Sequence, residues 1–162
     1  MKTYFGKYRG MVINNVDPQK QGRLQVSCPD VLGPNVMNWA MPCVPFAGPL
    51  EGFLMLPMIG ASVWVEFEAG DPDLPIWAGC FWGPGQTPPN VLSPTTRTIK
   101  TLTMELSLDD VLGLTAMVLP PTAPAPATVR INALGIELSL GKSSIRLDPA
   151  RVSVNNGALE VI

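Results

Sequence analysis

Histidine is absent from this sequence of 162 residues, and its absence removes several classes of catalytic and metal-binding site. Histidine is the usual general base near neutral pH and the commonest metal ligand in proteins. Without it, a cysteine such as Cys28 lacks the partner that normally activates a nucleophile. We therefore expect a protein that is not an enzyme and that binds no cofactor and no metal ion.

Charged residues and cysteines are also scarce. The 11 Lys and Arg residues against 13 Asp and Glu residues give a formal net charge of −2, with no basic run. Nothing in this charge favours nucleic acid or an anionic membrane as a partner. Cys28, Cys43 and Cys80 are odd in number and lack the spacing of a metal site, which predicts buried free thiols.

Long apolar runs are missing as well. Residues 1–10 lack the apolar core of a signal peptide, so the sequence predicts a protein made in the cytoplasm without a signal peptide. The longest apolar stretch, residues 52–65, is interrupted by Pro57 and Gly60. These interruptions favour a segment buried in a folded protein over a membrane span.

Glycine and proline, by contrast, are abundant, with 15 and 18 residues, and this composition suits many short strands joined by turns. Strand-like segments fall within residues 4–14, 23–28, 39–46, 62–68 and 74–82. Pro42 and Pro45 limit the third of these to a sheet edge, and residues 29–38 are predicted to form a loop. Five short strands bent by glycines predict an all-β fold that begins with an OB-fold barrel over residues 1–84.

Residues 135–162 contain a repeat of about eight residues, in which a short strand alternates apolar and polar side chains and a turn follows. The apolar positions are Ile136, Leu138, Leu140, Ile145, Leu147, Val152, Val154, Leu159 and Val161. Strands this short would form one narrow apolar face that needs a partner to cover it. Several copies wound about one axis would provide that cover. A two-sheet sandwich or a meander within a monomer remains the alternative.

The two halves are joined by a Gly- and Pro-rich stretch, and we predict a linker over residues 85–97. Residues 100–109 alternate as the repeat does, with Leu102, Met104, Leu106 and Leu108 on one face. Residues 119–127 (LPPTAPAPA) cannot form a central strand and are predicted to be an extended Pro-rich excursion on the surface. A second domain is therefore predicted over residues 98–162.

Several segments, in this order, resemble one family of proteins. In the first half they are residues 6–12 (GKYRGMV), 17–18 (DP), 22–26 (GRLQV), 63–67 (VWVEF) and 70–79 (GDPDLPIWAG). They are similar to the OB-fold domain of the central spike proteins of contractile tails. That family includes the phage baseplate assembly protein V and the related valine-glycine repeat protein G of type VI secretion. Residues 99–101, 106–110 and 135–138 resemble the family's entry into a trimeric β-helix.

The resemblance implies a homotrimer whose OB-fold barrels are followed by an intertwined trimeric β-helix, the needle, over residues 98–162. In this family the barrels sit against a baseplate hub and the first tube ring, and the needle makes transient contact with the target membrane. The chain would then be a structural spike of a phage tail or tail-like injection particle that helps to pierce the target envelope. The nine apolar positions of the repeat would form the trimer core.

The sequence also departs from some members of that family. It has no lysozyme domain between barrel and needle, and no large hub domain, which suggests a separate hub protein. Because histidine is absent, the His-x-His iron site that ends some needles cannot form. We therefore expect the end formed by Leu159, Val161 and Ile162 to be capped by a separate tip protein of the proline-alanine-alanine-arginine type.

Two other interpretations of the first half are weaker. Four tryptophans could stack on nucleic-acid bases, as in single-strand-binding OB domains: Trp39, Trp64, Trp77 and Trp82. Residues 1–92, however, contain five Lys and Arg against seven Asp and Glu, so a positive groove is not expected. Asp71 and Asp73 could hold a hard cation, but Pro72 between them favours a turn. An autonomous, monomeric OB-fold binding module with a β-rich tail remains the alternative function.

Overall fold

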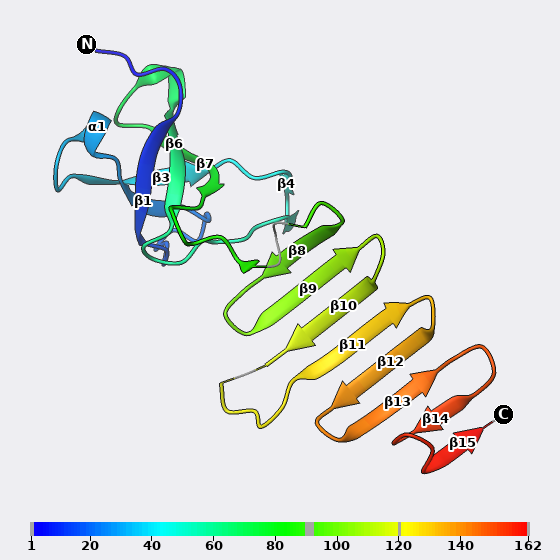
Figure 1. Cartoon of the computed structure of the whole chain (residues 1–162). Helices are drawn as coiled ribbons and strands as arrows, with labels where there is room; N and C mark the ends of the chain where they lie inside the picture. The colour runs from blue at the N-terminus through cyan, green and yellow to red at the C-terminus, as the bar shows by residue number, and fades with distance from the viewer. Residues whose placement is uncertain (1, 90–92, 120, 162) are drawn as a thin grey trace. The chain divides into compact units, whose positions relative to one another are not determined.

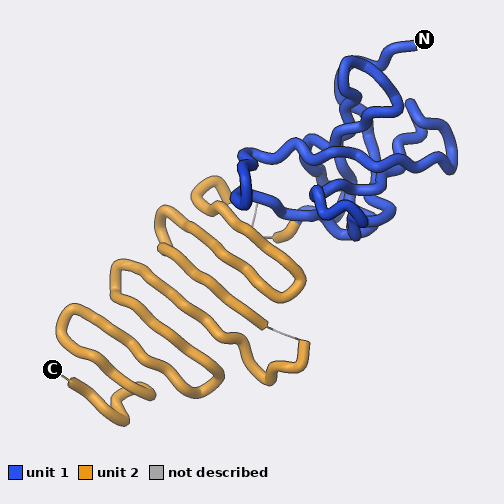
Figure 2. The backbone as a smooth tube through the Cα atoms, turned by 180° about the vertical axis from the view of Figure 1, so that it is seen from behind, with its two compact units in different colours: residues 1–87 blue, residues 88–162 orange. Residues whose placement is uncertain are grey.

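The computed structural model describes residues 2–89, 93–119 and 121–161 (Figure 1). The chain divides into two compact units, residues 1–87 and residues 88–162 (Figure 2). Parts of three predicted features lie outside the described residues: Ile162 of the tip end, residues 90–92 of the linker, and Pro120 of the Pro-rich segment. Strands are the main regular structure of both units, and the predicted all-β class is confirmed.

Unit 1 contains a closed barrel of five strands in the order β1-β2-β3-β7-β6. The strands are β1 (Tyr8–Asn14), β2 (Leu24–Ser27), β3 (Met37–Pro42), β6 (Ser62–Phe67) and β7 (Pro75–Phe81). Neighbouring strands are antiparallel except β3 and β7, which are parallel and close the barrel. This arrangement is an OB-fold, as predicted. The expectation of an edge strand at β3 is wrong, because β3 pairs with β2 on one side and β7 on the other.

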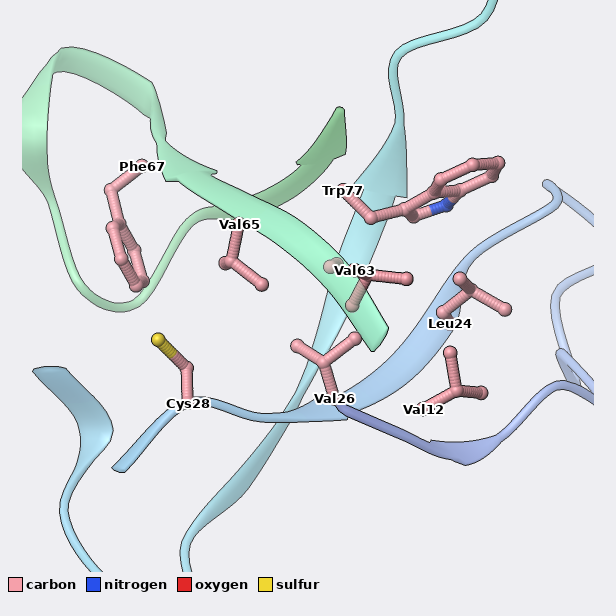
Figure 3. Packing of buried hydrophobic residues seen from close by; sticks show 9 residues of the cluster. Val12, Leu24, Val26, Cys28, Val63, Val65, Phe67 and Trp77 are labelled. Atoms are coloured by element: carbon pink, nitrogen blue, oxygen red, sulfur yellow. The ribbon is translucent and has the colours of Figure 1, made fainter. Parts of the chain in front are cut away.

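Alternation along the strands produces the core of this barrel. Val63, Val65 and Phe67 on β6 point inward, while the residues between them are partly exposed. They meet Val12, Leu24 and Val26 from β1 and β2 (Figure 3). The indole of Trp77 lies at one end of this cluster and donates a hydrogen bond from Nε1 to the Gly22 carbonyl oxygen at 3.1 Å.

Two sequence expectations for unit 1 need correction. Only Cys28 is a buried thiol, since Cys43 and Cys80 are both exposed. The stretch predicted as a loop between β2 and β3 contains a single helical turn, α1 (Pro29–Leu32), in which the N–H of Leu32 donates to the Cys28 carbonyl oxygen at 2.9 Å. A short 3-10 turn, η1 (Glu68–Gly70), follows β6. Within the described residues, no helix has the length and apolar character needed to span a membrane.

The connection from β3 to β6 is also different from the expectation. It contains only a hairpin of two-residue strands, β4 (Ala47–Gly48) and β5 (Glu51–Gly52). The prediction that residues 52–65 are buried is wrong for their first part. The apolar residues of this part are exposed, and they are Phe53, Leu54, Met55, Leu56, Met58 and Ile59. Burial begins only where the chain enters β6.

Unit 2 is a single sheet in which each strand pairs antiparallel with the next along the chain (Figure 1). Its strands are β8 (Thr96–Lys100), β9 (Met104–Asp109), β10 (Gly113–Val118), β11 (Ala127–Asn132), β12 (Gly135–Leu140), β13 (Ser143–Leu147), β14 (Val152–Val154) and β15 (Leu159–Val161). The Pro-rich segment, residues 119–127, joins β10 to β11 and gives its last residue to β11.

Residues 100–109, predicted as one alternating run, are broken by a turn between β8 and β9. The Thr101 hydroxyl accepts a hydrogen bond from the N–H of Met104 at 3.1 Å, which turns the chain back on itself. Leu102 lies in this turn and is exposed rather than being part of a strand face. Met104, Leu106 and Leu108 do share one face of β9.

Candidate functional site

The strand register of unit 2 gathers the apolar side chains on one face. Ile136 lies opposite Leu147, and Leu138 opposite Ile145, across β12 and β13. The pairing continues in β14 and β15, and all nine predicted positions fall on this face, which we call the apolar face. In a strand, side chains two residues apart share a face, so directly paired residues of neighbouring strands share it as well.

The apolar face extends across all eight strands as rows that run from strand to strand. Its middle row has one member from each strand: Ile99, Leu106, Ala116, Val129, Leu138, Ile145, Val154 and Leu159. A second row contains Leu108, Leu114, Ile131, Ile136, Leu147, Val152 and Val161. This second row begins with a charged residue, Arg97, whose Nη1 bonds Asp110 Oδ2 at 2.5 Å.

Among the described residues of unit 2, no segment covers the apolar face. Leu138 is 44% exposed, and the exposure of Leu140 and Leu159 rises to 61%. The face is hollowed near Ala116, Ala127 and Ser143, where small side chains line a groove of about 510 Å³ with Leu138 and Leu140 among its walls. Contiguous exposed apolar surface on this scale marks an interaction site. The nine predicted positions therefore share one unpartnered surface, and their role as a trimer core stays a prediction.

The opposite face is polar, and neighbouring strands carry opposite charges. Arg130 on β11 lies opposite Glu137 on β12, and Glu137 lies opposite Arg146 on β13. Near the last strand, Glu160 Oε1 pairs with Arg151 Nη1 at 2.8 Å. Such cross-strand pairs of opposite charge favour this register. A slip of one residue would separate these pairs and move the apolar side chains to the polar face. The sheet thus has one face suited to water and one suited to a partner.

Aspartates fix the turns at the strand ends. Asp109 accepts hydrogen bonds from the Thr96 hydroxyl and from the N–H groups of Val111 and Leu112. These bonds, that of Thr96 above all, lower the pKa of Asp109 to about 2. Asp148 holds the turn between β13 and β14 in the same way. It accepts a hydrogen bond from the N–H of Ala150, and this bond is the main cause that lowers the pKa of the Asp148 carboxyl group. Both carboxylates are charged at neutral pH, so both turns are held there.

Glycine is required where two hairpins come close to the next strand. Gly135 begins β12 with φ +138°, and a Cβ there would overlap the carbonyl oxygen of Leu147. Gly113 begins β10 with φ +88°, and a Cβ there would overlap the carbonyl oxygen of Ile131. Both positions combine a positive φ with a close backbone approach, which only glycine tolerates.

In unit 1, Asp17 organises the turn between β1 and β2. Its carboxylate accepts hydrogen bonds from the N–H groups of Gln19 and Gln21, and from the Arg23 side chain at 2.8 Å. The Arg23 side chain is the main cause that holds the pKa of Asp17 well below its usual range. The turn predicted over this segment is therefore secured by a carboxylate that stays charged far below neutral pH.

Two of the other site candidates have structural roles, whereas Trp82 is exposed. Trp64 packs on Phe81 with 4.5 Å between ring centroids, and the Arg9 guanidinium lies over both rings. Asp71 accepts a hydrogen bond from the N–H of Asp73 at 3.0 Å, so this pair forms a turn. Among the described residues, no cluster of three or more His, Cys, Asp or Glu could hold a metal ion.

Sequence reasoning missed the centre of the apolar face. Leu114 and Val118 on β10, and Val129 and Ile131 on β11, belong to it as fully as the repeat does. Alternation within residues 113–118 and 127–132 carries this signal. The proline-rich stretch between them divides it into two pieces, each too short to predict a face by itself.

Two family matches cover most of the chain in the order of these two units. Residues 8–82 match the type VI secretion system/phage-baseplate injector OB domain, and they contain all five barrel strands. Residues 96–160 match the phage baseplate V C-terminal trimerisation domain, which coincides with the eight-stranded sheet. A search of curated proteins found no match. A trimerisation domain accounts for an apolar face that the described residues of one chain leave uncovered. The two matches show that the chain belongs to the phage baseplate V family, the trimeric structural proteins of phage baseplates and type VI secretion spikes.

Proposed function

We propose that the chain is the central spike of a contractile injection machine and that its apolar face forms the dry core of a trimeric needle. The observation that carries this proposal is the continuity of that face over eight strands, with no cover from the residues that the structure describes. The family match supplies the number of copies, since it identifies the sheet as a trimerisation domain.

Simple geometry supports three copies. A strand of about six residues is about 20 Å long, and facing sheets pack about 10 Å apart. Three such sheets arranged as the sides of a triangular prism lie about 6 Å from the axis, so inward side chains fill the interior. Four sheets would lie about 10 Å from the axis and leave an open channel. A trimer is therefore the closed arrangement that these strand lengths fit.

The needle would be stiff because its strands are hydrogen-bonded around a packed core, and bending it would break many of these bonds together. A stiff, narrow rod is suited to piercing a target envelope during transient contact with the membrane. The barrels would hold the spike against the baseplate hub and the first tube ring. Because β9 to β14 already pair on both edges within their own sheet, the needle would be three such sheets wound about one axis, with few free edges along the rod.

The far end of the sheet supports the docking of a tip protein. Among the described strands, β15 pairs only with β14, and Leu159 and Val161 on β15 are 61% and 60% exposed. An uncovered edge strand with apolar side chains favours self-association unless another protein covers it. A tip protein of the proline-alanine-alanine-arginine type would cover it, with Ile162, outside the described residues, as the third predicted contact.

Electron cryomicroscopy of purified particles tests the whole proposal. We expect three copies of the chain on the tail axis, with ordered needle density and a separate tip polypeptide that mass spectrometry detects. Leu159→Asp combined with Val161→Asp should release the tip from particles that still contain three copies of the chain, while Ser139→Asp on the polar face should retain it. Ordered needles in particles without any tip polypeptide would contradict the capping. An autonomous OB-fold module would be a monomer absent from such particles.

A further inference from the structure

The connection between β3 and β6 carries many exposed apolar side chains. We define the apolar loop as residues 46–59. Its exposed apolar side chains are Phe46, Leu50, Phe53, Leu54, Met55, Leu56, Met58 and Ile59, with exposed fractions from 41% to 108%. Together they present on the order of 800 Å², which is about the share of one partner in a standard interface. The loop carries a single charged residue, Glu51.

Much of the apolar loop extends from the barrel, although the Leu54 side chain lies beside Gly22. Figure 1 shows the segment that carries β4 reaching away from the five barrel strands. Asn15 Nδ2 donates to the Pro57 carbonyl oxygen at 3.0 Å, and the N–H of Phe53 donates to the Phe46 carbonyl oxygen at 3.1 Å. The first bond ties the loop to the barrel and the second closes the hairpin within the loop, so the loop presents its side chains as a defined surface.

The backbone of the loop favours a protein partner over a lipid one. Within the part of the chain that the structure describes, the N–H groups of Leu54, Met55 and Leu56 make no hydrogen bond. In hydrocarbon such groups would stay unsatisfied, at a cost that excludes irregular backbone from the membrane interior. A neighbouring protein surface can supply carbonyl or side-chain oxygens to them. The absence of basic residues from the loop also removes any attraction to anionic lipid.

We propose that the apolar loop packs against the apolar loop of a second copy of this chain within the trimer. The barrel's last strand ends at Phe81 and the trimerisation match begins at residue 96, so each barrel is tethered by 14 residues. This tether spans at most about 50 Å and holds the barrels at an effective concentration near the millimolar range. The loop interface thus extends the trimer from the sheet to the barrels. This inference rests on the trimer described above.

Cysteine cross-linking of the full chain tests this contact. In a Cys43→Ser, Cys80→Ser background, Leu50→Cys places one thiol on the loop, and Leu74→Cys places one on another exposed part of the same barrel. With a short bismaleimide, Leu50→Cys should give covalent dimers inside particles that keep the native mass of a trimer. Leu74→Cys should react with the reagent but give no dimers. Adding Met58→Glu to Leu50→Cys should lower the dimer yield several-fold.

The remaining outcomes each decide the question. A trimer whose Leu50→Cys thiols react but do not cross-link would overturn the loop contact and leave the proposed spike intact. Cross-linked species with the mass of two trimers would show contact between particles, which also overturns it. Loss of cross-linking when phosphatidylcholine vesicles are added would identify lipid as the partner instead. A monomer in native mass spectrometry would overturn the spike itself and this inference with it.

Discussion

Replacement of Leu138 by alanine should weaken the assembly of the trimer while leaving the single chain folded. Leu138 lies in the middle row of the apolar face, between Val129 and Ile145. In one chain it is 44% exposed, so nearly half of its surface is available for burial against other copies. The substitution therefore acts mainly on association.

The expected loss of association free energy follows from the atoms that the substitution removes. Leucine to alanine deletes three carbon groups, worth about 2.4 kcal/mol on full burial. If the exposed 44% is buried on assembly, about 1 kcal/mol per copy, or about 3 kcal/mol per trimer, falls on the association step. That is a loss of about 150-fold in the association constant, and a cavity left at the axis would increase it.

Dilution of the purified protein followed by native mass spectrometry measures this loss directly. Leu138→Asp should go further and prevent assembly, because three carboxylates would be buried at one level, each costing several kcal/mol. Ser139→Asp is the matched control, since Ser139 lies on the polar face opposite Thr128 and Ser144. A Leu138→Asp variant that forms trimers as well as the unaltered chain would refute the inward position of the apolar face.

Three further predictions concern the two units separately. Leu24→Ala in the barrel core should cost about 2–5 kcal/mol and lower the melting temperature of the barrel by about 10 °C or more in a calorimeter, with the trimer mass unchanged. Gly135→Ala should disrupt the β12–β13 pairing and abolish the trimer in light scattering, whereas Ser139→Ala should not. The low pKa of Asp17 stabilises the barrel fully above about pH 4, and this stabilisation declines as the pH falls further. Melting curves from pH 7 to pH 2 should show that decline, and Asp17→Asn should flatten it.

The apolar face could be predicted because alternation is a local signal. Ile136, Leu138 and Leu140 show it within six residues, and the register needed only short turns to bring successive strands together. The five-stranded barrel was predictable for a similar reason, since β2 and β6 alternate clearly. Local pattern and global fold agree in these elements.

Features that depend on distant contacts could not be predicted in this way. The pairing of β3 with β7 joins segments more than thirty residues apart and is parallel, so neither strand alone indicates it. Residues 52–65 have the composition of a core, and only the three-dimensional structure separates the exposed loop from β6. Exposure of Cys43 and Cys80 likewise depends on which strand face each one occupies.

The most direct test of the central claim is the native mass of the purified full chain, before and after heating in detergent. The account predicts a particle of about 52 kDa, which is three times the 17.4 kDa chain, and it predicts that this particle survives the treatment. A protein that runs as a 17.4 kDa monomer before any treatment would contradict an apolar face buried between three copies.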